Sequence, residues 1–376
     1  MRYVLKGREL SDSRIAGRKE HAMGEWRKNI REVTPYIPGE QPQFADMIKL
    51  NTNENPYPPA PGVAKVLAGL DAGKLKLYPK PDARELVDAL AAEYGVAPEQ
   101  VFVGVGSDDV LGMAFLTCFT GGKEILFPDI TYSFYPVWAE LFGIRYRTPA
   151  LDENFRIKKE DYFVPNGGVV IANPNAPTSV AMPLADIEEI VAKNTDSVVI
   201  IDEAYVDFGG ESALPLVERY DNLLVVQTFS KSRSMAGMRI GFAIGSRELI
   251  AAMYAVRNSY NSYTLNYPSI LCGVEAVKDR AYFEQTKAAI VSTREKTAKR
   301  LRELGFQVLP SAANFLFVRH ERMPAEELFA TLREKHIFVR YFKKPRIENF
   351  LRITIGTPEE MERFLAETEA CLHKLP

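Results

Sequence analysis

Short apolar runs recur between about residues 82 and 245 and alternate with stretches of helical periodicity. The runs are rich in β-branched residues and apolar at consecutive positions, a pattern typical of strands buried on both faces of a mostly parallel sheet. The stretch 186–194 (DIEEIVAKN) shows the helical spacing that lies between such runs. This alternation predicts an α/β, doubly wound layout. The predicted strands are 101–105 (VFVGV), 124–127 (EILF), 169–172 (VVIA), 198–201 (VVII), 223–227 (LLVVQ) and 242–244 (FAI).

The pattern changes after Tyr267-Pro268. A long charged helical region, about 271–304, precedes short apolar runs that predict strands, and a helix at about 358–372 closes the chain. We expect this part to form a smaller α+β domain. The predicted strands here are GFQVL (305–309), NFLFV (314–318) and FLRITI (350–355). The predicted division is 1–45 for an N-terminal extension and arm, 46–265 for a large domain and 266–376 for a small C-terminal domain.

The first 59 residues lack a clear period. Residues 1–30 are charged and weakly patterned, and we expect residues 1–22 to be either a disordered extension or the product of an upstream start. Residues 34–59 are dense in Pro, Asn and Gly, which predicts an extended, turn-rich arm rather than a helix or strand.

Composition narrows the classes of function. The 376 residues include 46% hydrophobic and 26% charged ones, the balance of a globular protein with a sizeable core. A formal net charge of −2 argues against a surface for nucleic acid, so we expect a small-molecule partner.

Neither a metal site nor a membrane span is expected. Cys118, Cys272 and Cys371 lie far apart, and the four histidines are equally scattered, so neither a disulfide framework nor a metal site is predicted. No apolar run approaches the roughly 18–20 residues of a membrane span, and the amino terminus lacks the apolar core of a secretory signal. We expect a cytoplasmic protein without a metal.

Polar residues follow four of the predicted strands, at the sheet edge where α/β proteins bind ligands. They are Gly106-Ser107-Asp108, Asn173-Pro174-Asn175, Asp202-Glu203-Ala204-Tyr205 and Thr228-Phe229-Ser230-Lys231. At the first, Ser107 and Asp108 begin an apolar helix, whose free N–H groups would attract an anion. They would equally serve as ordinary helix caps, and both interpretations stay open.

Asp202 and Lys231 each follow a buried strand. A buried carboxylate needs a cationic partner, for which a protonated pyridine nitrogen is one candidate. A partly buried lysine has the lowered pKa that suits a Schiff base with an aldehyde cofactor. A plain salt bridge between the two residues is the alternative. Arg239 would suit a phosphate and Arg352 a substrate carboxylate or phosphate, with a structural salt bridge as the alternative for Arg352.

Eight segments, in this order, resemble the fold-type I enzymes that depend on pyridoxal 5'-phosphate (PLP), and within them the histidinol-phosphate aminotransferase family. The resemblance covers about residues 34–376 and implies a mostly parallel seven-stranded sheet sandwiched by helices, with a smaller α+β domain. The segments are LNTNENPYPP (50–59), LYPKPDARELVDAL (77–90), GVGSDDVL (104–111), NPNAPTS (173–179), DEAYVDF (202–208), TFSKSRSMAGMRIGFAIG (228–245), ANFLFV (313–318) and LRITIGTPEE (351–360).

The resemblance implies roles around the cofactor ring. Lys231 is implied as the lysine that forms the Schiff base with PLP and moves the substrate proton. Asp202 is implied as the partner of the pyridine nitrogen, Tyr205 as the partner of the ring hydroxyl, and Tyr132 as the ring stacked on the cofactor. Asn175 is a further candidate for the ring hydroxyl.

The resemblance also implies the sites of the two anions. Ser107, Asp108, Ser230 and Arg239 would bind the cofactor phosphate, together with Tyr78 from the neighbouring subunit of a homodimer. In the substrate site, the implied residues are Tyr36, Arg340 and Arg352.

The implied reaction moves an amino group from histidinol phosphate to 2-oxoglutarate. An aromatic amino-acid aminotransferase on the same scaffold is one alternative, and a PLP-dependent decarboxylase of a phosphorylated amino acid is another. A regulatory protein without activity is disfavoured because Lys231, Asp202 and Arg352 are all present.

Two positions depart from the family pattern. Ala176 stands where the family often has an Asn that bonds the ring hydroxyl, so that either Asn175 or Tyr205 alone would make this contact. Arg233, in Ser232-Arg233-Ser234, follows the lysine where small or aromatic residues are common, and it would lie near the phosphate or face solvent.

Overall fold

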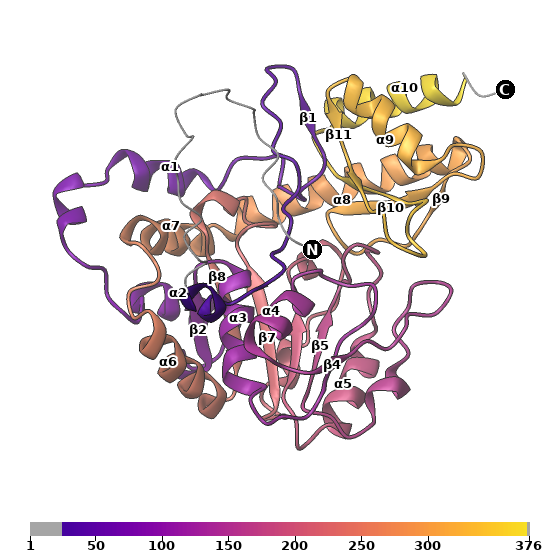
Figure 1. The fold of residues 1–376 in the computed structure, drawn as a ribbon. Coiled ribbons are helices and arrows are strands. Elements are labelled where there is room, and N and C mark those ends of the chain that lie inside the picture. Colours follow the sequence, from indigo (N-terminus) through magenta and orange to yellow (C-terminus); the bar gives the residue numbers. More distant parts are fainter. Residues whose placement is uncertain (1–24, 374–376) are drawn as a thin grey trace, which may run out of the picture. The chain divides into compact units, whose positions relative to one another are not determined.

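The computed structural model describes residues 25–373 (Figure 1). The predicted extension at residues 1–22 therefore lies outside the described residues. Contacts divide the chain into two units, residues 1–35 and 36–376. The described part of the first unit holds a short 3-10 helix, Glu25–Asn29. The other helices and strands belong to the second unit.

A seven-stranded sheet in the order β2-β8-β7-β6-β5-β3-β4 forms the centre of the second unit. All neighbours are parallel except β8, which is antiparallel to both β2 and β7. The six predicted strands are confirmed, and β4 is an additional, largely exposed edge strand with little apolar pattern to reveal it. The strands are β2 (Val101–Gly104), β3 (Ile125–Leu126), β4 (Tyr146–Arg147), β5 (Gly168–Ala172), β6 (Val199–Asp202), β7 (Leu223–Thr228) and β8 (Gly241–Gly245).

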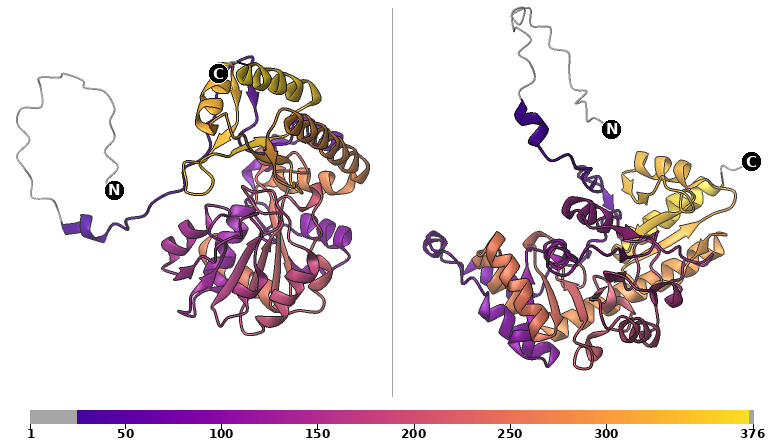
Figure 2. Two further views of the ribbon diagram at one scale, coloured as in Figure 1. Left: turned by 90° about the vertical axis from the view of Figure 1, so that its right-hand side faces the viewer. Right: turned by 60° about the horizontal axis from the view of Figure 1, so that its bottom comes forward.

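Helices cover both faces of this sheet, as the continuous apolar runs predict (Figures 1 and 2). On β6, Val199 and Ile201 pack with α1, α2, α5 and α7, whereas Ile200 points to the opposite face and packs with α3, α4 and α6. The alternating strand geometry thus builds two cores from one run of apolar residues. The helices are α1 (Pro61–Ala68), α2 (Arg84–Tyr94), α3 (Ser107–Cys118), α4 (Tyr135–Phe142), α5 (Leu184–Lys193), α6 (Arg247–Tyr260) and α7 (Tyr267–Lys278).

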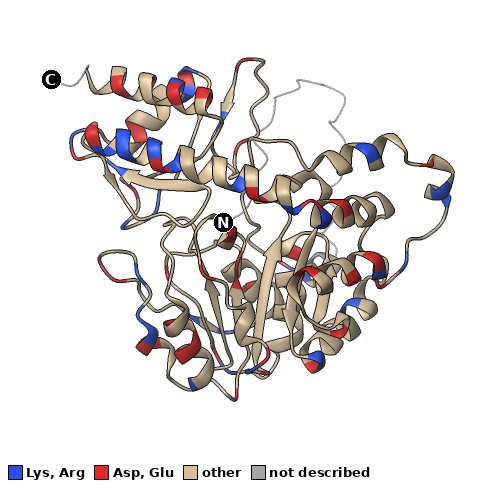
Figure 3. Ribbon diagram, turned by 180° about the vertical axis from the view of Figure 1, so that it is seen from behind, with Lys and Arg blue, Asp and Glu red and all other residues tan. Residues whose placement is uncertain are grey.

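The predicted long helix at 271–304 is two helices, α7 and α8 (Arg280–Glu303). The break falls at Asp279, whose carboxylate accepts a hydrogen bond from the Tyr282 N–H at 3.1 Å and so caps α8. Figure 3 shows Lys, Arg, Asp and Glu along the helices, whereas the strands of the central sheet are largely free of them. Among residues 25–373, no helix is both long and apolar enough to cross a membrane.

The C-terminal part contains a four-stranded antiparallel sheet in the order β12-β13-β10-β9. Its core also receives Ile48 and Leu50 from the arm, because β1 pairs in parallel with β11. The predicted division at residues 45 and 265 stays a prediction. The elements are β1 (Ile48–Lys49), β9 (Gln307–Val308), β10 (Phe315–Arg319), α9 (Ala325–Glu334), β11 (Ile337–Phe338), β12 (Arg340–Tyr341), β13 (Leu351–Thr354) and α10 (Pro358–Leu372).

Candidate active site

Asp202 ends β6 and is 5% exposed. Its Oδ2 accepts a hydrogen bond from the Tyr135 hydroxyl at 2.8 Å, and its Oδ1 accepts one from the Ala204 N–H at 3.2 Å. Burial raises the pKa of this carboxyl to about 6, although the Tyr135 hydrogen bond acts in the opposite direction. A cation placed beside Asp202 would therefore be strongly favoured.

Lys231 lies three residues beyond the end of β7 and is half-buried. Its Nζ donates a hydrogen bond to the Thr52 carbonyl at 3.0 Å and lies 5.8 Å from the centre of the Tyr205 ring. Burial, together with the charge of Arg352, lowers the pKa of this amine to about 8. Within residues 25–373, Lys231 forms no ion pair with Asp202, so the structural salt bridge considered from the sequence is not formed.

An asparagine-rich turn, residues 51–55, connects these groups. Asn53 Nδ2 donates to the Tyr205 hydroxyl at 2.9 Å, and the Asn51 carbonyl accepts from Arg352 Nη2 at 2.9 Å. Asn53 has a φ of 57°, a left-handed conformation that Asn tolerates better than most residues. Sequence reasoning assigns no role to this turn beyond the resemblance, and the density of Asn in NTNEN is the only signal in the sequence.

The segment between the end of β2 and the start of α3 forms a cradle. The helix begins after Gly106 without a side-chain cap, so Ser107 and Asp108 belong to its first turn and do not act as caps. The N–H groups of a first turn have no partner inside the helix. A Cβ on Gly106 would collide with Arg239 Nη2, and one on Gly241 would collide with the backbone of residues 106 and 107. Close approach of these segments thus requires glycine.

Tyr132 and Arg239 meet the same first turn through Asp108. The Tyr132 hydroxyl donates to Asp108 Oδ1 at 2.8 Å, and Arg239 Nη2 lies 3.6 Å from Asp108 Oδ2. Ser230, which directly precedes Lys231, is buried. Its Oγ accepts a hydrogen bond from the Thr228 hydroxyl at 3.1 Å. These contacts bring the Tyr132 ring and the Arg239 guanidinium to the amino end of α3.

Arg352 on β13 lies directly opposite Arg340 on β12. Burial lowers the pKa of Arg352, and its Nε is buried without a hydrogen-bond partner among the described residues. Because its hydrogen bond goes to a neutral carbonyl and not to a carboxylate, the predicted alternative of a structural salt bridge is not formed within residues 25–373. Two adjacent guanidinium groups favour an anion.

Two aromatic residues lie at the margins of this set. The Tyr36 ring stacks on Phe134 with 4.3 Å between ring centres, and it lies 6.4 Å from the Tyr132 ring. Tyr78, by contrast, is 81% exposed and stacks on Tyr263, away from the groups described above. Among the described residues, the contacts thus link Tyr36, Tyr132, Asp108 and Arg239 into one set, and Lys231, Tyr205 and Arg352 into another through the turn 51–55, whereas Tyr78 joins neither.

The profile of the aminotransferase class I and II family matches residues 45–367. Histidinol-phosphate aminotransferase 1 of Methylococcus capsulatus is 55% identical over 340 residues, which cover 90% of this chain and 95% of the relative. The corresponding enzyme of Chromohalobacter salexigens is 53% identical over 345 residues, or 92% and 98% of the two chains. The chain belongs to the histidinol-phosphate aminotransferase family.

A solved structure supports the same fold. The histidinol-phosphate aminotransferase of Sinorhizobium meliloti, solved with pyridoxal-5'-phosphate, matches with a TM-score of 0.78 at 23% identity, over 86% of this chain and 90% of that one. The predicted family and the predicted fold class are both confirmed.

One departure from the family pattern is Ala176, which leaves Asn175 as the candidate to replace the missing amide. Asn175 Nδ2 donates to the Ile130 carbonyl and the Thr178 hydroxyl, each at 2.9 Å, and its Oδ1 accepts from Thr131 at 2.8 Å. Both donor hydrogens of the amide are thus engaged in the scaffold. Ala176 packs beside Tyr205.

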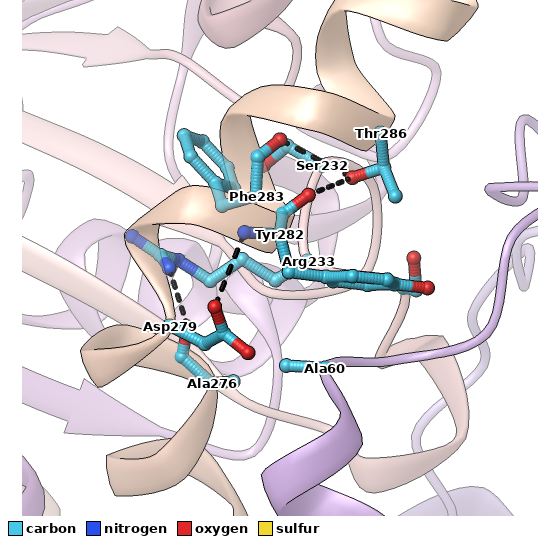
Figure 4. Close-up of a pocket in the computed structure, with 9 residues that line it drawn as sticks. Ala60, Ser232, Arg233, Ala276, Asp279, Tyr282, Phe283 and Thr286 are labelled. Atoms are coloured by element: carbon cyan, nitrogen blue, oxygen red, sulfur yellow. Dashed lines mark hydrogen bonds between the residues drawn. The ribbon is translucent and has the colours of Figure 1, made fainter.

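Arg233, the other departure, is only 8% exposed, and its side chain lies beside Ala276 and Phe283 (Figure 4). Its Nη1 donates to the Ala276 carbonyl near the end of α7 at 2.8 Å, and the guanidinium lies 4.5 Å from the Phe283 ring centre on α8. The solvent-facing position considered from the sequence is therefore wrong. The side chain instead anchors the segment that follows Lys231 to the junction of α7 and α8, where helix carbonyls attract a cation.

Four residues that contact the predicted site are not selected from the sequence. Tyr135 contacts Asp202 and Asn51 contacts Arg352. Thr52 contacts Lys231 and Asn53 contacts Tyr205. Tyr135 carried a weak signal, since it stands in the aromatic run around Tyr132. Asn51 and Thr52 act through backbone carbonyls, which no side-chain pattern encodes.

Proposed function

We propose that the chain transfers the amino group of histidinol phosphate to 2-oxoglutarate, with PLP held at Lys231, as a step of histidine biosynthesis in the cytoplasm. One observation carries the proposal: the turn 51–55 contacts Lys231, Tyr205 and Arg352 together, so an amine with a lowered pKa, a phenol and an anion-binding guanidinium share one site. The names of the relatives support the choice of substrate.

Three features of the chain fit PLP. The buried Asp202 carboxylate suits a protonated pyridine nitrogen. The first turn of α3, between Gly106 and Gly241, suits a phosphate. Lys231 has the lowered pKa that nucleophilic lysines require.

Side chains of the protein would orient the PLP ring and control the protons on it. Asp202 would keep the pyridine nitrogen protonated, and the Tyr132 ring would stack on the cofactor. The Tyr205 hydroxyl accepts from Asn53, so its own hydrogen is left to donate to the ring hydroxyl oxygen. Asn175 would contribute to the same contact only by giving up a scaffold hydrogen bond, so Tyr205 is the stronger candidate. When bound, PLP supplies the electron sink for the charge left by the α-proton.

The phosphate of the cofactor would be held by N–H groups and cations. Ser107 and Asp108 would contribute first-turn N–H groups, Ser230 a hydroxyl and Arg239 a guanidinium. The Asp108 carboxylate would orient Tyr132 and Arg239 rather than bind the anion. Its like charge would otherwise repel the phosphate.

We extend the proposal to a homodimer in which Tyr78 reaches the neighbouring phosphate site. Tyr78 is strongly exposed in the single chain, and contact of its apolar ring with water is unfavourable. The same surface carries further exposed apolar side chains, which support a protein partner there. They are Leu75, Leu77, Tyr260 and Tyr263.

At the substrate, Lys231 Nζ would remove the α-proton and return it to the cofactor carbon. Arg352 would bind the phosphate of histidinol phosphate in one half-reaction and a carboxylate of 2-oxoglutarate in the other, aided by Arg340. Tyr36 would help hold the phosphate end. The pairing of Arg340 with Arg352 supports a doubly charged anion and argues for a phosphorylated donor over a plain aromatic amino acid.

A single-turnover half-reaction tests the substrate. PLP-loaded protein is mixed with histidinol phosphate or with phenylalanine, and loss of the bound cofactor's absorbance is followed. We expect fast conversion by histidinol phosphate and slow conversion by phenylalanine. The reverse order would assign an aromatic aminotransferase, and release of carbon dioxide without transfer of a labelled amino group to 2-oxoglutarate would assign a decarboxylase.

We propose large and small domains at residues 46–265 and 266–376, after an extension and arm at 1–45. We also propose that no nucleic acid or membrane is bound, which the net charge of −2 supports.

A further inference from the structure

An ion pair closes the turn that holds Lys231. Lys49 Nζ contacts both carboxylate oxygens of Glu54, and the Thr52 hydroxyl donates to Glu54 Oε2. The Lys49 side chain is 17% exposed and the Glu54 side chain 41%, so the pair is shielded from water mainly on the Lys49 side. Shielding strengthens both the attraction and the constraint that it imposes on residues 49–54.

This turn contacts Lys231 at both its side-chain amine and its backbone carbonyl. The Thr52 carbonyl accepts the hydrogen bond from Lys231 Nζ at 3.0 Å, and the adjacent Asn55 Nδ2 donates to the Lys231 carbonyl at 3.0 Å. Movement of the turn would therefore move the amine. Glu54 does not touch the amine itself, and it acts through Thr52 and through its charge.

Glu54 carries its negative charge near Lys231. Although burial raises the pKa of Glu54, the hydrogen bonds from Lys49 and Thr52 outweigh burial and hold the pKa below its usual value. Burial and Arg352 lower the pKa of Lys231, whereas the charge of Glu54 raises it. The charged and titratable groups that face Lys231 are Glu54, Tyr205, Asp108, Arg239 and Arg352.

We propose that Glu54, held by Lys49, is a positioning residue for Lys231: it fixes the Thr52 carbonyl that orients the amine, and its charge sets how readily the amine holds a proton. The inference rests on the proposed function, in which Lys231 moves the substrate proton. Lys49 is then the counter-charge that limits the effect of Glu54. Removal of the anion and removal of the cation must act on the amine in opposite directions.

The test measures proton binding by Lys231 in the full chain after removal of the cofactor. Protein is treated briefly with acetic anhydride across pH 6–10, and the acetylated fraction of the Lys231 peptide is read by mass spectrometry, because only the neutral amine reacts. Glu54→Gln and Lys49→Met are compared with the wild type. Glu188→Gln is the matched control, since Glu188 pairs with Arg219 at an exposed position elsewhere in the fold.

We expect the Lys231 midpoint, near pH 8 in the wild type, to fall by about half a unit or more in Glu54→Gln and to rise by a smaller amount in Lys49→Met, which acts only by leaving Glu54 without its counter-charge. Glu188→Gln should leave it in place. Both variants break the same ion pair, so a purely structural clamp would shift both midpoints in one direction. Shifts in one direction, or none, overturn the proposal.

Two arrangements keep the outcome clear. Unfolding curves of each variant are recorded first, and if Glu54→Gln does not fold, Glu54→Asp replaces it with a smaller expected shift of the same sign. Because neither cofactor nor substrate is present, the result stands even if histidinol phosphate is not the donor. Failure of the half-reaction and failure of this test are therefore distinguishable.

Discussion

Two regions build the site by different physical means. The ends of β6 and β7 supply Asp202 and Lys231, whose pKa values burial shifts toward the neutral form, to about 6 and about 8. The turn 51–55 supplies amides and carbonyls that hold these groups in place. The strand ends thus contribute reactivity and the turn contributes geometry, so we expect changes in the two regions to alter different measurements.

The largest expected effect belongs to the strand ends. Under the proposed function, Lys231→Ala would remove both the attachment of the cofactor and the group that moves the proton. We expect the rate of the single-turnover half-reaction to fall at least about a thousand-fold, within the range for loss of a general base. Lys159→Ala is the control, because Lys159 pairs with Asp186 away from the site. An unchanged rate in Lys231→Ala would refute the assignment of the lysine.

Asp202→Asn should separate activity from stability. We expect the half-reaction to slow about a hundred-fold or more, because the neutral amide no longer stabilises a protonated ring nitrogen. In the cofactor-free chain the same change should stabilise the fold. Asp202 has a folded pKa of about 6 against 3.8 for the free group, so its stability contribution is complete below pH 4 and lost as pH rises through 6.

The gain on replacing Asp202 should therefore grow between pH 4 and pH 7, to at most about 3 kcal/mol. Urea unfolding of wild type and Asp202→Asn at several pH values measures it. Tyr135→Phe gives a matched comparison, since loss of its hydrogen bond removes an influence that lowers the Asp202 pKa. A stability difference that does not change with pH would contradict the raised pKa.

Asn53 tests the turn, with a smaller effect. Asn53→Gly removes the hydrogen bonds to Tyr205 and Thr354 but tolerates the φ of 57°, whereas Asn53→Ala also strains the backbone. We expect both variants to weaken cofactor binding about ten-fold. Asn53→Ala should unfold more readily than Asn53→Gly by about 1 kcal/mol. Equal stability of the two would argue against strain at this position.

The same contrast explains which parts of the site the sequence predicts. Asp202 ends the buried strand β6, Tyr205 follows it and Lys231 follows the buried strand β7, and the common direction of these parallel strands brings their ends together. The contacts of the turn join residues far apart in the chain: Asn53 and Tyr205 are separated by 152 positions, and Asn51 and Arg352 by 301. No local pattern specifies such pairs.

Three other differences between the predicted and the observed structure have separate causes. The short strand β4 offers too few apolar residues to stand out, and the break at Asp279 depends on one capping hydrogen bond within an otherwise helical stretch. Arg233 is polar in sequence but is buried, because the Ala276 carbonyl and the Phe283 ring satisfy its guanidinium. At Arg233 the missing information is thus a tertiary contact, whereas at Asp279 it is a local capping hydrogen bond.

We expect the smallest effect from removing the Tyr132 hydroxyl, because its partner Asp108 is partly exposed to solvent. Tyr132→Phe keeps the ring that would stack on the cofactor and removes only the hydrogen bond to Asp108, a half-exposed carboxylate that also pairs with Arg239. We expect the dissociation constant for PLP to rise about two- to ten-fold, with little change in the half-reaction rate. Tyr132→Ala, which also removes the ring, should weaken binding much further. If the two variants behaved alike, the hydroxyl rather than the ring would be the main contribution of Tyr132, and stacking would lose its support.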